Sequence, residues 1–413
     1  MTVPALLSRA ADWLVRHRSS FPGWLNRVLE APARNPDGAF GRIVMRALGG
    51  GETPATPVPS TEIRVLIAPT NYSGQAFRWA RALEAADPRI GARNRAEQLP
   101  GGFDFDADAL VPFATAQGSE RWADAEFAAA REFTHVLVEA ERPLFGRRFG
   151  RDLEQEILAL TEEGVSVAYL CHGTDIRDPA RHAERTPWSL YPEDPRTELL
   201  AQDAAANLAL LRRVPRPTFV STPDLLFDVP WARWCPVVVD VERFRQRSEP
   251  FGARPVRIVH AASAPLQKGS HYIPPALDPL IAAELVDYRL ITGVPSAQMP
   301  DVFDAADIVI DQFRAGSYGV AACEAMAAGR VVIGHVLPEV RAYVEETTGL
   351  ALPIVEATPD TLEAVVRALV AAPAESRELA AQGRRFVETV HAGPLSARVL
   401  LEDWIAPGVT PGR

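Results

Sequence analysis

Short apolar runs alternate with helical patterns along most of this chain, and no other feature restricts the fold as strongly. The run at 64–68 reads Arg-Val-Leu-Ile-Ala, and a turn at 71–74 leads into a helical pattern at 75–84. Such runs are typical of strands buried on both faces of a parallel sheet. Alternation with helices predicts an α/β, doubly wound fold. In the first half the other runs lie at 134–138, 165–170 and 218–221, and helical patterns lie at 151–163 and 198–213.

A second block of the same kind begins after a polar segment broken by Pro250 and Gly252. Its predicted strands are 256–260, 288–292, 308–310 and 331–333, and its predicted helices are 302–306, 320–328 and 361–371. At 413 residues the chain exceeds the size at which a single core stops growing. We therefore predict two Rossmann-like domains facing a cleft, at 61–245 and 253–393. Residues 1–60 are predicted to form a helical, basic extension with a linker, and 394–413 a helix that crosses back to the first domain.

Composition excludes several classes of protein. A net charge of −10 argues against a nucleic-acid-binding protein. Three cysteines, Cys171, Cys235 and Cys323, form no close pair, and no signal-peptide pattern is evident, which favours a reduced cytoplasmic setting. No apolar stretch is long enough to span a bilayer. Residues 1–50 carry seven arginines against three acidic residues. This basic segment permits weak contact with the inner face of a membrane, although a helix that packs on the protein body fits the pattern better.

Lys268 is the only lysine among forty-three basic residues. It follows the predicted strand at 256–260, in the first strand-to-helix turn of the second block. A lysine ammonium is a compact point charge that can neutralise phosphate oxygens, whereas arginine is a broad planar fork. The alternative is one surface lysine without a function. The position in the turn favours a phosphate-binding role.

A glycine-rich turn follows the predicted strand at 308–310. Gly316-Ser317-Tyr318-Gly319 leads into a helical pattern that begins at Val320 and contains Glu324. Glycines allow backbone amides to approach a ligand, and a helix N-terminus favours phosphate. Glu324 lies one turn into this helix among apolar neighbours, where it can accept hydrogen bonds from sugar hydroxyls.

At this point the chain resembles the GT-B glycosyltransferases of the large retaining family 4. The resemblance covers roughly 63–404 and depends on several motifs taken together. They are Lys268-Gly269, Ala305-Ala306-Asp307-Ile308, Tyr318-Gly319 through Glu324-Ala325-Met326-Ala327-Ala328-Gly329, Val220-Ser221-Thr222-Pro223, Val239 through Phe244, and Gly383-Arg384-Arg385.

Two positions depart from the family pattern. The family usually has a glutamate eight positions before Glu324, where this chain has Gly316, and an arginine five positions before Lys268, where it has Ser263. By resemblance, the first residue contacts the transferred sugar and the second contacts the diphosphate. Diphosphate binding is therefore expected to depend on Lys268 and backbone amides. Gly-Ser-Tyr-Gly resembles the pattern of a subset of these enzymes.

The resemblance also indicates candidate residues in the first domain. His172 follows the predicted strand at 165–170 and is the candidate histidine that faces the donor sugar, with Asp175 as an acceptor-side candidate. Gly74 lies in the first strand-to-helix turn, where it admits a ligand or only shapes the turn. The catalytic candidates are Lys268, Glu324 and His172. The donor-binding candidates are Gly74, Ser263, Lys268, Val294, Gly316, Ser317, Tyr318, Gly319, Val320 and Glu324.

The function implied is transfer of a sugar from a nucleotide-diphosphate sugar to an acceptor hydroxyl, with retention and without a metal or other cofactor. The acceptor is expected to be a glycan, a lipid-linked molecule or a small molecule. Two alternatives remain: a non-catalytic nucleotide-sugar-binding protein, motivated by Gly316 and Ser263, and a sugar phosphorylase that holds pyridoxal phosphate on Lys268. We find no metal-ligand spacing in the sequence.

Overall fold

A computed structural model describes residues 38–39, 41, 53–98 and 105–405. The predicted helix near the N-terminus and the end of the 394–413 segment lie outside these residues. The described chain divides into two compact units. One contains the residues up to Cys171, Ala209–Thr218 and the segment from Asp403; the other contains His172–Leu208 and Phe219–Glu402. None of the described helices is long and apolar enough to cross a membrane.

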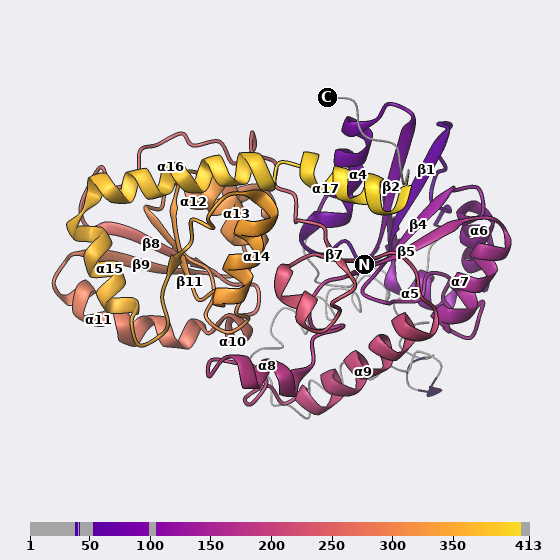
Figure 1. Cartoon of the computed structure of the whole chain (residues 1–413), viewed down its shortest axis with the longest axis horizontal. Helices are drawn as coiled ribbons and strands as arrows, with labels where there is room; N and C mark the ends of the chain where they lie inside the picture. Colours follow the sequence, from indigo (N-terminus) through magenta and orange to yellow (C-terminus); the bar gives the residue numbers. More distant parts are fainter. Residues whose placement is uncertain (1–37, 40, 42–52, 99–104, 406–413) are drawn as a thin grey trace, which may run out of the picture. The chain divides into compact units, whose positions relative to one another are not determined.

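The first sheet has seven parallel strands in the order β3-β2-β1-β4-β5-β6-β7. Helix α4 packs on β1 and β2, and α7 packs on β5 on the other face of the sheet (Figure 1). The strands are β1 (Ile63–Ala68), β2 (Ile90–Gln98), β3 (Ala109–Pro112), β4 (His135–Glu139), β5 (Ser166–Cys171), β6 (Thr218–Val220) and β7 (Arg233–Trp234). The helices are α4 (Gln75–Ala86), α5 (Phe113–Gly118), α6 (Glu120–Ala130), α7 (Leu153–Glu162), α8 (Pro179–Arg185) and α9 (Thr197–Arg213), with 3₁₀ turns η2 (Tyr72–Gly74) and η3 (Pro223–Phe227).

The second sheet has five parallel strands in the order β12-β11-β10-β8-β9. The strands are β8 (Val256–Ala261), β9 (Val286–Ile291), β10 (Ile308–Ile310), β11 (Val331–Gly334) and β12 (Val355–Glu356). The helices are α10 (Pro265–Lys268), α11 (Ile273–Ala282), α12 (Met299–Asp304), α13 (Val320–Ala327), α14 (Pro338–Thr348), α15 (Leu362–Ala371), α16 (Pro373–Val390) and α17 (Pro394–Leu400), followed by a π-helix at Leu401–Ile405. Short 3₁₀ turns are η4 (Ser270–Tyr272) and η5 (Ser296–Gln298).

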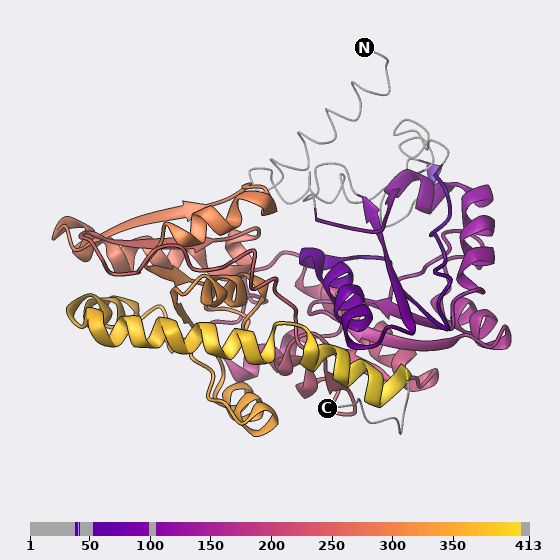
Figure 2. The ribbon, with the colours of Figure 1, turned by 90° about the horizontal axis from the view of Figure 1, so that it is seen from above.

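Helices cover both faces of the second sheet. Helices α11 and α15 lie against one face, and α12, α13 and α16 against the other (Figure 1). Helix α16 is the long yellow helix that runs along this unit in both views (Figure 2). It approaches α13 closely at Gly383, where an added Cβ would lie 3.1 Å from Met326 Cγ. The predicted α/β fold with two parallel sheets is confirmed.

The predicted strands at 64–68 and 308–310 correspond to β1 and β10, whose side chains are almost all buried. Strand β2 is absent from the sequence prediction because its residues, Ile-Gly-Ala-Arg-Asn-Arg-Ala-Glu-Gln, include many polar ones. Arg95 is nevertheless fully buried, because its Nη1 donates to Leu144 O at 2.7 Å and lies 3.4 Å from Glu126 Oε1. Polar residues fit this strand because distant parts of the chain supply their partners.

Residues 53–61, read as part of a linker, have little regular structure but pack on the first unit. Thr56 is buried, and its backbone N and Oγ1 both donate to the Glu126 carboxylate, at 2.8 and 2.7 Å. At the other end of the described chain, Trp404 Nε1 donates to Ser166 Oγ at 2.9 Å, and its ring meets His135 edge-on. Both segments are therefore attached to the first unit by hydrogen bonds. The predicted domain boundaries remain a prediction.

Candidate functional site

The strand order of the second sheet defines where a ligand is expected. The chain proceeds from β8 outward to β9 and then returns to β10 on the other side of β8. In an open α/β sheet, ligands bind outside the carboxyl ends of the strands, at the point where the order reverses. Here that point lies between β8 and β10. The loops that follow these two strands contain most of the donor-binding residues proposed from the sequence.

Lys268 ends α10, in the loop that follows β8. Its Nζ donates to Ala261 O at 3.1 Å and to Asp311 Oδ1 at 2.9 Å. The lysine side chain is 19% exposed, whereas Asp311, the first residue after β10, is only 2% exposed. The ammonium is therefore fixed by groups from both strands that flank the switch point. Asp311 was not among the sequence predictions, because a lone aspartate after an apolar run has no distinguishing pattern.

His260, on β8, joins this strand to its neighbours. Its Nδ1 lies 2.8 Å from Ile310 O, and its Nε2 lies 2.7 Å from Ser270 Oγ. Burial lowers its pKa to about 4, so the ring is neutral at physiological pH. The histidine supports the loop that contains Lys268, and its own side chain is fully buried in the interior.

Arg314 supports the same loop from the other side, and sequence reasoning missed it. Its side chain is 1% exposed. The guanidinium donates to Glu193 Oε2 at 2.9 Å and to Leu266 O at 3.2 Å, and also to the backbone oxygens of Trp188 and Ser189 at 3.3 and 3.1 Å. Among forty-two arginines, nothing in the sequence distinguishes this one. It fixes the segment near 188–193 and the α10 loop together.

The glycine-rich turn after β10 has a conformation that its sequence explains. Gly316 has a φ of +66°, and a Cβ there would lie 2.8 Å from Leu337 Cγ. Ser317 is buried, and its carbonyl accepts from Gln312 Nε2 at 2.9 Å. Gly319 has a φ of −125° and open space where a Cβ would be. The turn therefore requires glycine at 316 for conformation and packing, whereas the approach to Gly319 is unobstructed.

Tyr318 and Glu324 have different surroundings. The Tyr318 side chain is buried, and its hydroxyl lies 3.3 Å from His391 Nε2, so this side chain belongs to the interior. Val320 and Glu324, on α13, are half-buried. Burial, followed by the nearby carboxylates Asp311 and Glu324, raises the pKa of Cys323 well above its ordinary value.

The remaining candidates in this unit occupy loops. Ser263 is exposed in the turn after β8, and Val294 is half-buried in the turn after β9. The structure thus brings Ser263, Lys268, Val294 and 316–319 to the carboxyl ends of three strands in one sheet. No hydrogen-bond pattern distinguishes Ser263 or Val294 among the described residues.

His172 and Asp175 form a turn immediately after β5. The backbone N of His172 donates to Asp175 Oδ2 at 2.8 Å, and that of Gly173 donates to the same carboxylate. Asn207 Nδ2 donates to Asp175 O at 2.8 Å. Asp175 therefore organises the turn that presents His172. Gly74 lies in the other unit, at the start of α4, with a φ of +73°, and a Cβ there would lie 3.4 Å from the Phe105 ring.

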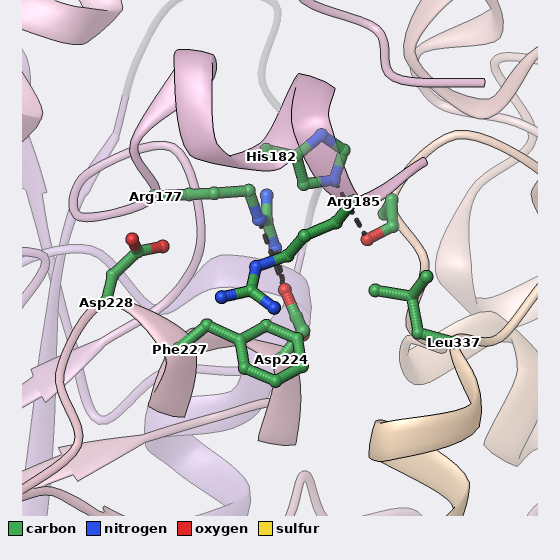
Figure 3. A pocket seen from close by; sticks show the side chains of 8 residues that line it. Arg177, His182, Arg185, Asp224, Phe227, Asp228 and Leu337 are labelled. Carbon is green, nitrogen blue, oxygen red and sulfur yellow. Dashed lines mark hydrogen bonds and ion pairs between the residues drawn. The ribbon is translucent and has the colours of Figure 1, made fainter. Parts of the chain in front are cut away.

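A small pocket in the second unit borders the glycine-rich turn (Figure 3). Arg177 Nε donates to Asp224 Oδ2 at 3.1 Å, and His182 Nε2 lies 3.2 Å from Ala315 O. Burial raises the pKa of Asp224, but the Arg177 guanidinium outweighs burial and holds that pKa below its ordinary value. Since these groups pair with one another, the pocket is a polar junction. It is lined by Arg177, His182, Arg185, Asp224, Phe227, Asp228, Ala315 and Leu337.

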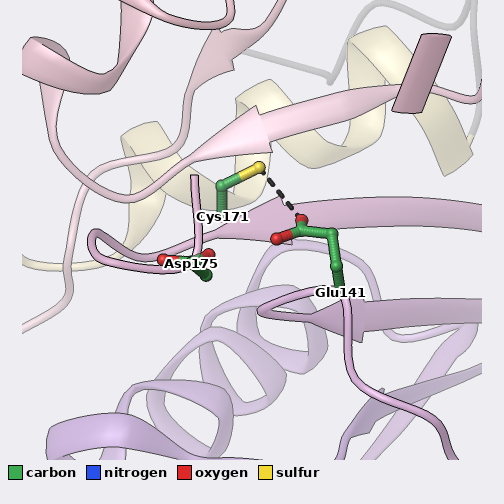
Figure 4. A group of neighbouring side chains, drawn as sticks. All are labelled: Glu141, Cys171 and Asp175. Carbon is green, nitrogen blue, oxygen red and sulfur yellow. Dashed lines mark hydrogen bonds between the residues drawn. The ribbon is translucent and has the colours of Figure 1, made fainter. Parts of the chain in front are cut away.

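Cys171 ends β5 in the first unit, and its Sγ donates to Glu141 Oε1 at 3.1 Å (Figure 4). None of the three cysteines forms a disulfide, and all three are buried. Such thiols pack as small apolar residues. We assign none of them a part in the donor site.

Comparisons with known proteins identify the fold. No protein-family model matches the chain, and no curated protein matches it in sequence. A sucrose-phosphate synthase from Thermosynechococcus elongatus is similar in structure, with a TM-score of 0.53 and 13% identity over 81% of this chain and 96% of the other. Anabaena HepE, in complex with UDP and glucose, has a TM-score of 0.53 and 10% identity over 82% and 98%. Its complex with UDP-glucose has a TM-score of 0.50 and 10% identity over 81% and 97%. The chain therefore has the GT-B fold.

Proposed function

We propose that this chain is a glycosyltransferase that moves a sugar from a nucleotide-diphosphate sugar to an acceptor hydroxyl. The observation that carries the proposal is the position of Lys268, fixed between the carboxyl ends of β8 and β10 beside a glycine-rich turn and the N-terminus of α13. Residues 253–393 would hold the donor, and residues 61–245 the acceptor. The solved HepE complexes with UDP and UDP-glucose support a nucleotide-sugar donor.

The proposed chemistry uses fixed positive charge. As the bond between the anomeric carbon and the diphosphate breaks, negative charge develops on the leaving phosphate oxygens. We assign the Lys268 ammonium and the backbone amides at 317–320 to stabilise that charge, because fixed groups need no reorganisation during the reaction. A helix N-terminus adds partial positive charge. Protein groups thus supply the electrostatic assistance, and the proposal includes no metal or other cofactor.

Retention follows if the departing phosphate assists the acceptor hydroxyl on the face that it leaves. In this scheme the phosphate oxygen accepts the acceptor's proton, so no strong side-chain base is needed. We assign Glu324 to sugar hydroxyls, because a half-buried carboxylate on α13 can accept hydrogen bonds from them. We assign His172 to the donor sugar and Asp175 to the turn that presents it. The acceptor is a glycan, a lipid-linked molecule or a small molecule, at the cytoplasmic face of a membrane or in the cytoplasm.

The first experiment is a thermal-shift panel of UDP-, GDP- and ADP-sugars, because a ligand that binds only the folded state raises the melting temperature. A donor that raises it is then incubated with candidate acceptors, and release of the nucleoside diphosphate is measured. We expect Lys268→Ala to abolish most of the shift and to lower the turnover rate by at least about a hundredfold, the order seen when one charge-stabilising donor is removed. Arg289→Ala is the matched control, since Arg289 is an exposed cation on β9. Unchanged binding and turnover in Lys268→Ala would reject the site.

A non-catalytic nucleotide-sugar-binding protein is the second candidate, and one observation favours it. Position 316 holds no carboxylate, and Leu337 occupies the space into which a side chain at that position would extend. The same panel separates the two functions. Binding that depends on Lys268, without hydrolysis or transfer to any acceptor, would favour the non-catalytic function.

A further inference from the structure

We propose that Asp311 is a positioning residue that holds the Lys268 ammonium and sets how strongly the site binds anions. This inference rests on the proposed function, and it assigns a role to a residue that the sequence did not single out. Asp311 is 2% exposed and forms the buried half of an ion pair with Lys268 at 2.9 Å. A buried carboxylate is costly unless it is paired, so its presence at the donor edge needs an explanation.

The geometry of Nζ supports this role. An ammonium has three N–H donors. Two of them are used by Ala261 O and Asp311 Oδ1, and the third has no partner among the described residues. Because one acceptor lies at the end of β8 and the other directly follows β10, they fix the position of Nζ and leave one donor for an incoming phosphate oxygen. The lysine side chain keeps 19% of its surface exposed, which provides that access.

The same pair moderates the charge of the site. An anion that accepts from Nζ lies within about 6 Å of the Asp311 carboxylate, since both contacts are near 2.9 Å. At such a distance two negative charges repel each other appreciably, even at the effective dielectric constant of a protein surface. Asp311 therefore weakens the hold of Lys268 on a diphosphate. A moderated hold favours release of the nucleoside diphosphate after transfer.

The second carboxylate oxygen of Asp311 also supports a role in holding Lys268. Its Oδ2 is buried and has no hydrogen-bond partner in the described part of the chain. The neighbouring Cys323 thiol is buried and has a raised pKa, for which burial is the main cause and Asp311 the next. In the described part of the chain, Lys268 is the cation that pairs with this carboxylate.

The test is a double-mutant cycle with four proteins: wild type, Asp311→Asn, Lys268→Met and the double variant. Asparagine keeps an oxygen that accepts from Nζ but removes the negative charge. We expect Asp311→Asn to bind UDP, ADP or GDP, whichever binds wild type, about tenfold more tightly by calorimetry. Asp287→Asn is the matched control, because it removes one charge from the surface of β9. We expect its affinity to stay within twofold of wild type.

Stability of the same four proteins supplies a readout that needs no ligand. Lys268→Met leaves the Asp311 charge buried without its partner, so this variant should be less stable than the double variant, in which the side chain at position 311 carries no charge. If Asp311→Asn binds the nucleoside diphosphate no more tightly than wild type, or if the double variant is less stable than Lys268→Met, the inference is wrong. If wild type binds no nucleoside diphosphate, the proposed function and the charge-moderating role both fail, while the stability cycle still shows whether the two residues are coupled.

Discussion

Replacing Gly316 by alanine tests the conformation of the glycine-rich turn. Gly316 has a φ of +66°, and a Cβ would lie 2.8 Å from Leu337 Cγ and 2.9 Å from its Cδ1. The left-handed conformation costs a non-glycine residue roughly 1–2 kcal/mol. Overpacking against a buried leucine costs roughly 1–3 kcal/mol more. We therefore expect Gly316→Ala to lower the free energy of unfolding by about 2–5 kcal/mol.

The assay is urea unfolding followed by tryptophan fluorescence, with the midpoint and the slope fitted separately. Gly319→Ala is the matched control in the same turn, because Gly319 has a φ of −125° and open space around its Cβ position. It should stay within about 1 kcal/mol of wild type. In the double variant with Leu337→Ala the clash is removed but the backbone strain remains, so the loss should be at least about 1 kcal/mol smaller than the sum of the single losses. Equal losses in Gly316→Ala and Gly319→Ala would refute the reasoning.

Two further predictions concern a buried arginine and buried titratable side chains. Arg314→Lys should lower the free energy of unfolding by about 2–4 kcal/mol, because lysine cannot reach all four acceptors and leaves buried oxygens unpaired. The control Arg289→Lys, on the surface, should change the free energy of unfolding by less than about 0.5 kcal/mol. Equal losses of the two variants in urea unfolding would contradict this prediction. Burial also lowers the pKa of four histidines to about 4. Below pH 6.5 the unfolded chain takes up protons on these histidines, whereas the folded protein keeps their rings neutral. The free energy of unfolding should therefore be unaffected above pH 6.5 and should fall by about 1.4 kcal/mol per pH unit for each histidine as the pH falls from 6.5 toward 4. The buried carboxyl of Glu156, whose pKa burial raises to about 7, changes stability in the opposite sense and offsets one of the four, and urea midpoints that stay constant from pH 7 to 5 would reject this prediction. These histidines are His135, His182, His260 and His391.

The proposed donor site shows where local sequence is informative. Lys268 is distinguished in the sequence as the only lysine, and its position after an apolar run indicates a strand-to-helix turn. Gly316 and Gly319 were recognisable as a turn before a helix, but their different roles depend on Leu337, which is far from both along the chain. Sequence therefore located the turn, and packing decided which glycine is required.

Other residues could not be found from the sequence because their partners are remote. Asp311 pairs with a lysine forty-three positions away, and Arg314 contacts oxygens more than one hundred and twenty positions away at Trp188 and Ser189. Strand β2 was missed for the same reason, since Arg95 is buried only because Leu144 and Glu126 supply its partners. Polar groups reveal their burial only when the fold brings those partners together.

The sequence by itself determined the α/β class, the two parallel sheets and the position of the lone lysine, because strand and helix periodicities are local properties of the chain. Tertiary structure alone decided the order of the strands, and with it the meeting of the β8 and β10 ends at one switch point. It also decided that Lys268 is held by Asp311 and is not free in solvent. The physical reason is that β9 follows β8 in sequence, whereas the partner of Lys268, Asp311, follows β10, which pairs with β8 on its other side.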